Sequence, residues 1–454
     1  MEAIMSVVAP IFWGVIVLSA LVFVHEGGHF LAARACGVRV TEFFLGLPCR
    51  FNVHHASKRI GTKFGVTPLL LGGYAAICGM DPEEAPLAAP VLSAIHRRGT
   101  VTVSELAEEL EASKDDVLDA CAFLMSWGSV APVYDESKGE RPNGKYYPST
   151  YAAMPRDKAG NTIFDGRAFD RAHATAQGEP WEPEMGAEKF LEQERSRTYL
   201  GKGFWKRALM LVAGIGVNIL TGFLIMVFAY SVLGTQVARD VNVIGDVTPG
   251  SPAATAGIES GDAIEAVGDT QTSSFTDIYQ ALQTYKPGDE VTLTCRRDGA
   301  ERIVSARIGN DGVLGIAAQT ETFHLSPLDA MRVTAGYVAA TAAGVAQLVQ
   351  PQHTMEVLQN SSSIVGISVM SAQAASEGPS TLLSFAALIS FSLAFMNLLP
   401  IPPLDGGKLL IEIIQALTRK TVPLKVQTNL SYAGVVLFAL LFVFMLRTDI
   451  LRLI

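Results

Sequence analysis

Charged residues are scarce in this chain. Asp, Glu, Lys and Arg make up 17% of its 454 residues, whereas a soluble protein usually contains about 25%. Hydrophobic residues account for 49%, the mean hydropathy is +0.30, and several long apolar runs contain almost no charge. This shortage argues against an ordinary soluble enzyme and indicates a membrane protein that carries soluble pieces.

The chain also has no excess of positive charge and no closely spaced pair of cysteines. The formal net charge is −9, and residues 81–200 hold the whole acidic excess, with 22 Asp and Glu against 13 Lys and Arg. Because phosphate backbones bind positive surfaces, this balance argues against nucleic acid as the main partner. The five cysteines include no CxxC pair, which argues against a disulfide framework and a cysteine-based metal site.

The first apolar run, residues 11–24, lacks the marks of a cleaved signal peptide. No basic region precedes it, and it leads into a His-Glu-Gly-Gly-His stretch instead of a small-residue cleavage site, so we expect a retained helix. Apolar length predicts four membrane spans, at 11–35, 208–233, 382–399 and 433–446. The Ala- and Gly-rich stretch 335–349 is expected to form a surface or re-entrant helix.

Basic residues indicate which loops face the cytoplasm. In this chain they follow the first span, precede the second, and lie between the third and the fourth. Placing all three groups in the cytoplasm predicts that both termini lie outside. The residues are Arg34, Arg39, Arg195, Arg197, Lys202, Lys206, Arg207, Arg419, Lys420 and Lys425.

Composition changes along the chain predict a polytopic α-helical membrane protein with about four transmembrane helices and two added domains. A Gly-containing apolar piece at 66–80 predicts a membrane-associated β-hairpin, and alternating residues at 237–309 predict a small β domain with a helix near Phe275 to Leu282. The segments are 1–80 (first span and hairpin), 81–200 (acidic insertion), 201–236 (second span), 237–310 (β domain), 311–380 (connecting and amphipathic segment) and 381–454 (third and fourth spans).

The sequence pattern of the insertion predicts a small cytoplasmic domain at 86–150. Apolar residues recur at helical spacing between Leu106 and Leu124, and Ser113 precedes Asp116 as in a helix cap. Residues 130–147 predict a two-stranded wing around Asn143-Gly144 or the polar loop before it. Together these features resemble a winged-helix domain. The polar, acidic residues 152–196 are expected to form a flexible linker.

The charge of this domain decides between two kinds of partner. The helix that would enter a DNA groove carries Lys114 but also Asp115, Asp116 and Asp119, which repel phosphates. We therefore favour a cytoplasmic protein partner or a regulatory role over nucleic acid binding.

The strongest chemical signal is His25-Glu26-Gly27-Gly28-His29. On a helix, residues four apart share a face, so the two imidazoles can hold one Zn²⁺ while Glu26 acts as general base on the water that the metal activates. HExxH also arises by chance. Ionisable residues inside a membrane helix are costly, however, and usually mark a functional site, so the metal site is the preferred interpretation.

A zinc site of this kind needs a third protein ligand, and Asp405 is the candidate. It follows Asn397 and a run with three prolines, Pro400, Pro402 and Pro403, which interrupt a helix. Free backbone groups at membrane depth are tolerated only inside protein or beside a wet cavity. The segment is therefore expected to line a cavity and direct the Asp405 carboxylate into it. Taken alone, the segment favours an ordinary helix-ending turn with Asp405 as a cap, and the HEGGH motif makes the ligand the preferred interpretation.

These motifs together resemble the site-2 proteases, specifically the bacterial regulator-of-sigma-E type. The resemblance covers residues 5–80 and 200–447 and leaves out the acidic insertion. It rests on HEGGH, on Gly72-Gly73-Tyr74, on the AGIGVN stretch that ends at Asn218, on a PDZ-like segment, and on NLLPIPPLDGG. Ile215 stands where the family often has proline, which leaves the local shape there open.

The resemblance implies a role for each matching residue. His25, His29 and Asp405 would bind Zn²⁺, and Glu26 would be the catalytic base. Residues Gly72, Gly73 and Tyr74 would present an unwound substrate as an added strand, Asn397 would help hold it, and Asn218 is placed with these residues. The implied substrates are single-pass membrane proteins already cut by another protease, such as anti-sigma factors or remnant signal peptides, and the implied location is the bacterial inner membrane.

Residues 247–262 resemble the core of a PDZ domain, with turns at Pro249-Gly250 and Gly261-Asp262. PDZ grooves accept a peptide as an extra strand. The domain would lie outside the cytoplasm, and either peptide binding or exclusion of bulky substrates fits a protease that acts on trimmed proteins.

The residues alone leave two other functions to consider. A non-catalytic membrane sensor or scaffold could use the same soluble domains, but it has no need of HExxH and Asp405. A zinc transporter is expected to place more polar residues along several helices, and the third and fourth predicted helices of this chain contain few. His54-His55 could form a second metal site, although surface histidines are the simpler interpretation.

Overall fold

The computed structural model describes the whole chain except residues 1, 81–84, 143–146 and 454. It divides into two compact units, one comprising residues 1–226 and 332–454 and the other residues 227–331.

Four helices of the described chain are long and apolar enough to cross a membrane, which confirms the predicted number of spans. They are α1 (Glu2–Ala35), α6 (Phe204–Phe228), α12 (Pro379–Asn397) and α14 (Leu424–Leu453). The apolar stretches cover Val8–Ala35, Phe204–Leu233, Pro379–Asn397 and Leu424–Leu451. A short π-helical turn, η4 (Ala229–Leu233), continues α6.

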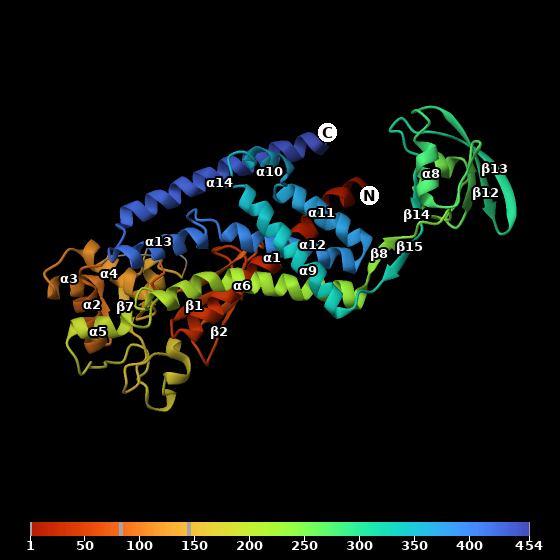
Figure 1. The fold of residues 1–454 in the computed structure, drawn as a ribbon. Helices are drawn as coiled ribbons and strands as arrows, with labels where there is room; N and C mark the ends of the chain where they lie inside the picture. The colour runs from red at the N-terminus through yellow and green to blue at the C-terminus, as the bar shows by residue number, and fades with distance from the viewer. Residues whose placement is uncertain (1, 81–84, 143–146, 454) are drawn as a thin grey trace. The chain divides into compact units, whose positions relative to one another are not determined.

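The segment between the soluble domain and the third span is more helical than its composition suggested. It contains α9 (Pro327–Gln347), which includes most of the predicted surface helix, as well as α10 (Thr354–Asn360) and α11 (Ile364–Glu377). Helix α11 packs along α1 and also contacts α12 and α14. After α12 the chain makes a turn and continues as α13 (Asp405–Thr418). Helices α11 and α13 thus belong to the same unit as the four long apolar helices (Figure 1).

A four-stranded sheet beside the C-terminal half of α1 replaces the predicted β-hairpin. Its strands are β1 (Val40–Leu45), β2 (Val53–Ala56), β3 (Lys63–Val66) and β4 (Gly73–Ile77), in the order β2-β3-β1-β4. Strands β1 and β3 are parallel, whereas β4 pairs antiparallel with β1, and Phe44 lies opposite Tyr74. The prediction of a hairpin at 66–80 was therefore wrong. The partner of β4 is β1, a strand distant in sequence that no local pattern identifies.

The insertion forms a compact domain around a three-stranded sheet (Figure 1). Ser113 caps α4 as predicted, accepting from the Asp116 N–H at 3.1 Å, and Asn143-Gly144 lies outside the described residues. The elements are α2 (Ala88–Arg98), β5 (Thr100–Thr102), α3 (Val103–Glu109), α4 (Lys114–Ser126), β6 (Val130–Val133), η1 (Glu136–Lys138) and β7 (Thr150–Ala153), and the sheet order is β5-β7-β6.

The expected flexible linker at 152–196 is wrong. This segment contains η2 (Ile163–Ala168), η3 (Arg171–His173) and α5 (Ala187–Arg195), and Arg156 and Glu194 in it are fully buried. The Glu194 carboxylate accepts from Arg156 at 2.7 Å and from Arg39, which follows α1, at 2.6 Å. The charged residues that suggested flexibility are thus paired inside the protein, and they attach the insertion to the end of α1.

Burial and the neighbouring charges shift the pKa values of Glu194 and His96 in this network. Burial alone would raise the pKa of the Glu194 carboxyl, but the guanidinium groups of Arg156 and Arg39 outweigh it and hold the pKa well below its usual range. Burial, reinforced by the Arg156 cation, lowers the pKa of His96 to about 3. His96 is therefore neutral, and its Nε2 accepts from the Nε–H of Arg156 at 3.1 Å.

The second unit is a β domain, and its helix α8 (Phe275–Leu282) has the predicted bounds. Ile278 of α8 packs with Val291 and Leu293 of the sheet in one buried core. The other elements are β8 (Thr235–Ala238), β9 (Ile244–Val247), α7 (Pro252–Thr255), β10 (Ala263–Val267), β11 (Thr270–Gln271), β12 (Glu290–Arg297), β13 (Ala300–Arg307), β14 (Ile316–Ala318) and β15 (Thr320–Phe323). The sheets have the orders β11-β10-β12-β13, β14-β9 and β15-β8.

Candidate metal centre

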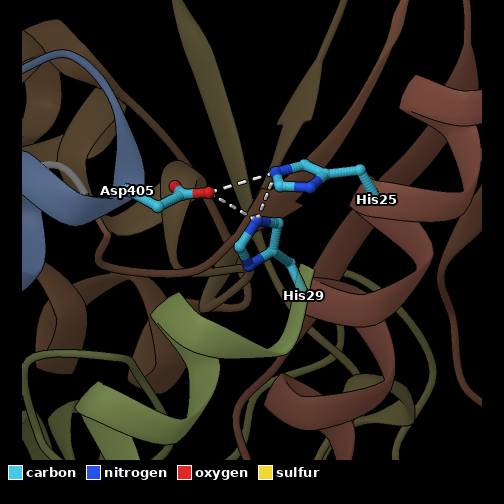
Figure 2. Close-up of side chains that lie close together, drawn as sticks. All are labelled: His25, His29 and Asp405. Atoms are coloured by element: carbon cyan, nitrogen blue, oxygen red, sulfur yellow. Dashed lines mark hydrogen bonds and ion pairs between the residues drawn. The ribbon is translucent and has the colours of Figure 1, made fainter. Parts of the chain in front are cut away.

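Two histidines of α1 and one carboxylate of α13 meet inside the first unit. The Nε2 atoms of His25 and His29 are 3.1 Å apart, as expected for residues one helical turn apart. Asp405 Oδ2 lies 3.0 Å from Nε2 of His25 and 3.1 Å from Nε2 of His29. Figure 2 shows the Asp405 carboxylate facing the two rings from the side opposite to α1, the helix that carries them. All three side chains are largely buried.

The proline-containing turn places Asp405 at this point. Helix α12 ends at Asn397, and Asp405 is the first residue of α13. Between them the backbone closes two tight turns, from Ile401 N–H to Leu399 C=O and from Leu404 N–H to Ile401 C=O. A Cβ on Gly407 would lie 2.2 Å from the backbone nitrogen of Pro402, so the start of α13 can fold back on the turn only because this residue is glycine.

Helix α13 is held in place at a second point beyond Asp405. Glu412 lies two turns further along the helix and is buried. It accepts from the Tyr199 hydroxyl at 3.1 Å and pairs with Arg207 at 3.2 Å. The helix that carries Asp405 is therefore attached to the segment that enters α6.

Helix α6 contacts the two histidines at their Nδ1 atoms, away from the Nε2 atoms that face Asp405. His29 Nδ1 lies 2.7 Å from the backbone carbonyl of Met210. A carbonyl only accepts, so Nδ1 carries the proton and Nε2 keeps its lone pair for the centre. His25 Nδ1 lies 3.4 Å from the side-chain amide of the fully buried Asn218. Second partners of this kind commonly orient metal-binding histidines.

A glycine between these two contacts allows α6 to approach. Met210, Gly214 and Asn218 follow one another at intervals of four and so share a face of α6. A Cβ on Gly214 would lie 2.5 Å from His29 Nε2 and 2.8 Å from His25 Cε1. Our sequence interpretation missed the Met210 carbonyl and the role of Gly214, although the four-residue spacing leading to Asn218 was a visible signal.

The other predicted site residues divide into those beside the centre and those away from it. Glu26 contacts β4, because its side chain meets the backbone N–H of Ala75 and a Cβ on Gly73 would lie 3.8 Å from its Cγ. The Tyr74 hydroxyl instead donates to Glu42 at 2.9 Å. Gly72 precedes this strand with φ of +152°.

Asn397 is not joined to the centre by any hydrogen bond among the described residues. Its side-chain amide donates to the Leu393 carbonyl at 3.0 Å. His54 is exposed and lies 2.7 Å from the side chain of Asn52. Within the described chain, the possible second metal site at His54-His55 gathers no third ligand.

The three gathered residues fit a zinc ion. Within the described chain, His25, His29 and Asp405 are the group whose ligand atoms lie close enough together to hold a metal ion. Two imidazole nitrogens and one carboxylate oxygen form a common catalytic zinc set that leaves a fourth position open. Ligand atoms about 2.0–2.1 Å from a tetrahedral zinc lie roughly 3.3 Å apart, close to the observed 3.0–3.1 Å.

Comparison with known proteins supports the same chemistry. The sequence profile of peptidase family M50 matches residues 13–441. The zinc metalloprotease RasP of Geobacillus kaustophilus (strain HTA426) is 26% identical over 445 residues, covering 96% of each chain. The regulator of sigma-W protease RasP of Bacillus subtilis (strain 168) is 27% identical over 449 residues, covering 97% of each chain.

A putative zinc metalloprotease, Atu1380, of Agrobacterium fabrum (strain C58 / ATCC 33970) is 25% identical over 461 residues, covering 97% of this chain and 95% of its own. Each of these three matches covers 96–97% of this chain, and four of its helices are long and apolar enough to cross a membrane. The predicted resemblance is thereby confirmed, and the expected alternative of a non-catalytic sensor is not favoured. The chain belongs to peptidase family M50 and is a multi-pass intramembrane zinc metalloprotease.

Proposed function

We propose that this protease cuts the transmembrane segments of single-pass membrane proteins, with His25, His29 and Asp405 as its zinc ligands and Glu26 as its general base. One observation carries the proposal: three ligand atoms lie within 3.1 Å of one another. Two of them belong to a helix of membrane length, α1, and Glu26 lies between these two histidines in the sequence. No other grouping in the described chain combines a metal-binding set with an adjacent base.

The residues divide the chemical work. A bound zinc supplies Lewis-acid chemistry, which acidifies water and polarises a carbonyl oxygen. Glu26 takes a proton from the attacking water and returns it to the leaving amine. Its neighbours on β4 keep it beside the centre. The Met210 carbonyl keeps His29 in the tautomer that can bind metal.

The position of β4 supports substrate binding by strand addition. The sheet order places β4 at an edge, and edge strands offer unpaired backbone groups to an extended peptide. Gly73 and Tyr74 begin this strand and Gly72 directly precedes it, and the strand contacts Glu26. A transmembrane helix that unwinds along β4 would bring its backbone to the base. Asn397 would hold the substrate from the end of α12.

The two soluble domains have proposed roles of their own. The order helix, strand, two helices and two paired strands in the insertion supports a winged-helix-like domain. Exposed acidic residues on α3 and α4 favour a cytoplasmic protein partner over nucleic acid. The second unit has the strands and the helix α8 expected of a PDZ domain. It would lie outside the cytoplasm of a bacterial inner membrane and either bind or exclude substrate ends.

The substrate class follows from the relatives only by analogy. One relative is named a regulator of sigma-W protease, and this name suggests membrane-anchored anti-sigma factors. Remnant signal peptides are the second candidate. Both are single-pass proteins whose soluble part another protease can remove before the membrane segment is cut.

A trapping experiment tests the proposal. Glu26→Gln should keep bound zinc but lose cleavage, so that trimmed single-pass proteins accumulate uncut. His25→Ala should lose both the metal and the activity. Glu377→Gln, an exposed change at the end of α11, serves as the matched control and should behave as wild type. Cleavage by Glu26→Gln at the wild-type rate, or full zinc content in His25→Ala, would disprove the assignment.

A further inference from the structure

We propose that Asn218 is a positioning residue, whose side-chain carbonyl accepts the Nδ1 proton of His25 and so fixes this ring in its metal-binding form. The inference deepens the proposed function, because it rests on His25 being a zinc ligand. It assigns Asn218 to the support of the metal centre and removes it from the substrate-contacting residues.

Complete burial argues against a substrate contact. Asn218 has no exposed surface, and its backbone carbonyl accepts from the Ser390 hydroxyl of α12 at 2.9 Å. A substrate backbone could reach this amide only by displacing the groups that bury it. The side chain instead points at His25, with Nδ2 of Asn218 lying 3.4 Å from Nδ1 of the ring.

The tautomer of His25 determines what Asn218 must supply. Nε2 of His25 faces Asp405 and His29, so metal binding requires a free lone pair on Nε2 and a proton on Nδ1. That proton needs an acceptor, and an amide nitrogen is a donor. A half-turn of the Asn218 carboxamide exchanges its nitrogen and oxygen with almost no change in shape.

The unpartnered oxygen of Asn218 supports this reorientation. In the present orientation its Oδ1 is buried and makes no hydrogen bond. After the half-turn, Oδ1 occupies the position beside Nδ1 and accepts its proton. The half-turn also removes a contact between two donors, the amide N–H and the Nδ1 proton of His25, and gives the buried oxygen a partner.

The two histidines are then supported in parallel by one face of α6. His29 receives a backbone carbonyl from Met210, and His25 receives a side-chain carbonyl from Asn218, with Gly214 between them. The contact to His29 is made by a backbone carbonyl and does not use the side chain of Met210, whereas the contact to His25 depends on the side chain at 218. This difference makes Asn218 the point at which ring positioning can be tested by mutation.

The test compares three variants of the full-length protein in detergent. Asn218→Leu keeps the branching at Cγ, with larger δ groups, but has no acceptor. Asn218→Asp presents an acceptor oxygen in either orientation, and Thr221→Val removes a hydroxyl elsewhere on α6. Zinc affinity is measured by competition with a chelator, and ligand geometry by the absorption spectrum of bound Co²⁺. The Michaelis constant for a reporter transmembrane substrate is measured at saturating zinc.

Asn218→Leu is expected to lower zinc affinity by about 10–100-fold and to change the Co²⁺ spectrum, with an unchanged Michaelis constant. Asn218→Asp and Thr221→Val should retain wild-type affinity. An unchanged zinc affinity in Asn218→Leu overturns the inference, whether or not the Michaelis constant rises. If Asn218→Leu does not fold, Asn218→Asp decides, and a loss of affinity beyond tenfold overturns the inference. Full zinc affinity in His25→Ala would instead refute the proposed function itself.

Discussion

Replacing Gly214 with alanine should disable the metal centre through a single methyl group. The added Cβ would lie 2.5 Å from Nε2 of His29, 2.8 Å from Cε1 of His25 and 2.9 Å from the His25 carbonyl oxygen. Non-bonded heavy atoms prefer about 3.5–4.0 Å, so α6 would have to withdraw from α1 by roughly an ångström or the rings would have to turn.

Either response damages the site in a measurable way. Overpacking of a tight contact typically costs about 1–3 kcal/mol. Rotation of His29 also breaks its 2.7 Å contact with Met210, and loss of such a support lowers metal affinity by about 10–100-fold. Because a displacement near 1 Å can lower a catalytic rate about 100-fold, the turnover number should fall at least as far as zinc affinity.

A second glycine of the same helix provides the control. Gly216 has open space where its Cβ would stand, so Gly216→Ala should retain zinc and activity and gain a little helix stability. Zinc affinity by chelator competition and cleavage of a reporter substrate are compared for both variants. Equal zinc affinity and equal activity in Gly214→Ala and Gly216→Ala would refute the close approach of α6 to the histidines.

Three further predictions concern the soluble parts. Glu194→Gln leaves the buried Arg156 guanidinium without its carboxylate partner and leaves Arg39 paired with Asp165 alone. It should destabilise the insertion by about 3–5 kcal/mol. Hydrogen exchange measures this loss, and the exposed change Glu192→Gln should have no effect. His96 binds a proton below about pH 6.5 when unfolded but only near pH 3 when folded, so the insertion should lose about 1.4 kcal/mol per pH unit as the pH falls through this window. His96→Gln should remove that slope down to about pH 4.5, where the depressed pKa of Glu194 begins to act in the same direction. In the β domain, Asp262 accepts from Arg297 at 2.6 and 2.8 Å, so Asp262→Asn should cost about 1–3 kcal/mol and speed proteolysis there, whereas the exposed change Asp269→Asn should not.

Local patterns in the sequence identified the features that depend on nearby residues. The four apolar spans follow from length and hydropathy alone. The spacing of His25 and His29 places both rings on one face of any α-helix. The helix near Phe275 to Leu282 was predicted from the local pattern, and in the structure the Ser274 side chain caps it. Asp405 could be identified only because its proline-containing surroundings and the histidine pair pointed to the same chemistry.

The remaining features depend on contacts between distant parts of the chain. Arg39 and Glu194 are 155 residues apart, so their burial as a pair contradicts the flexibility that their charges suggest. Strand β4 pairs with β1 because the sheet is assembled across an intervening hairpin, β2-β3. The Met210 carbonyl orients His29 through the backbone, which leaves no mark on residue type. Burial and backbone contacts of this kind are created by packing, and only the folded chain decides which groups they bring together.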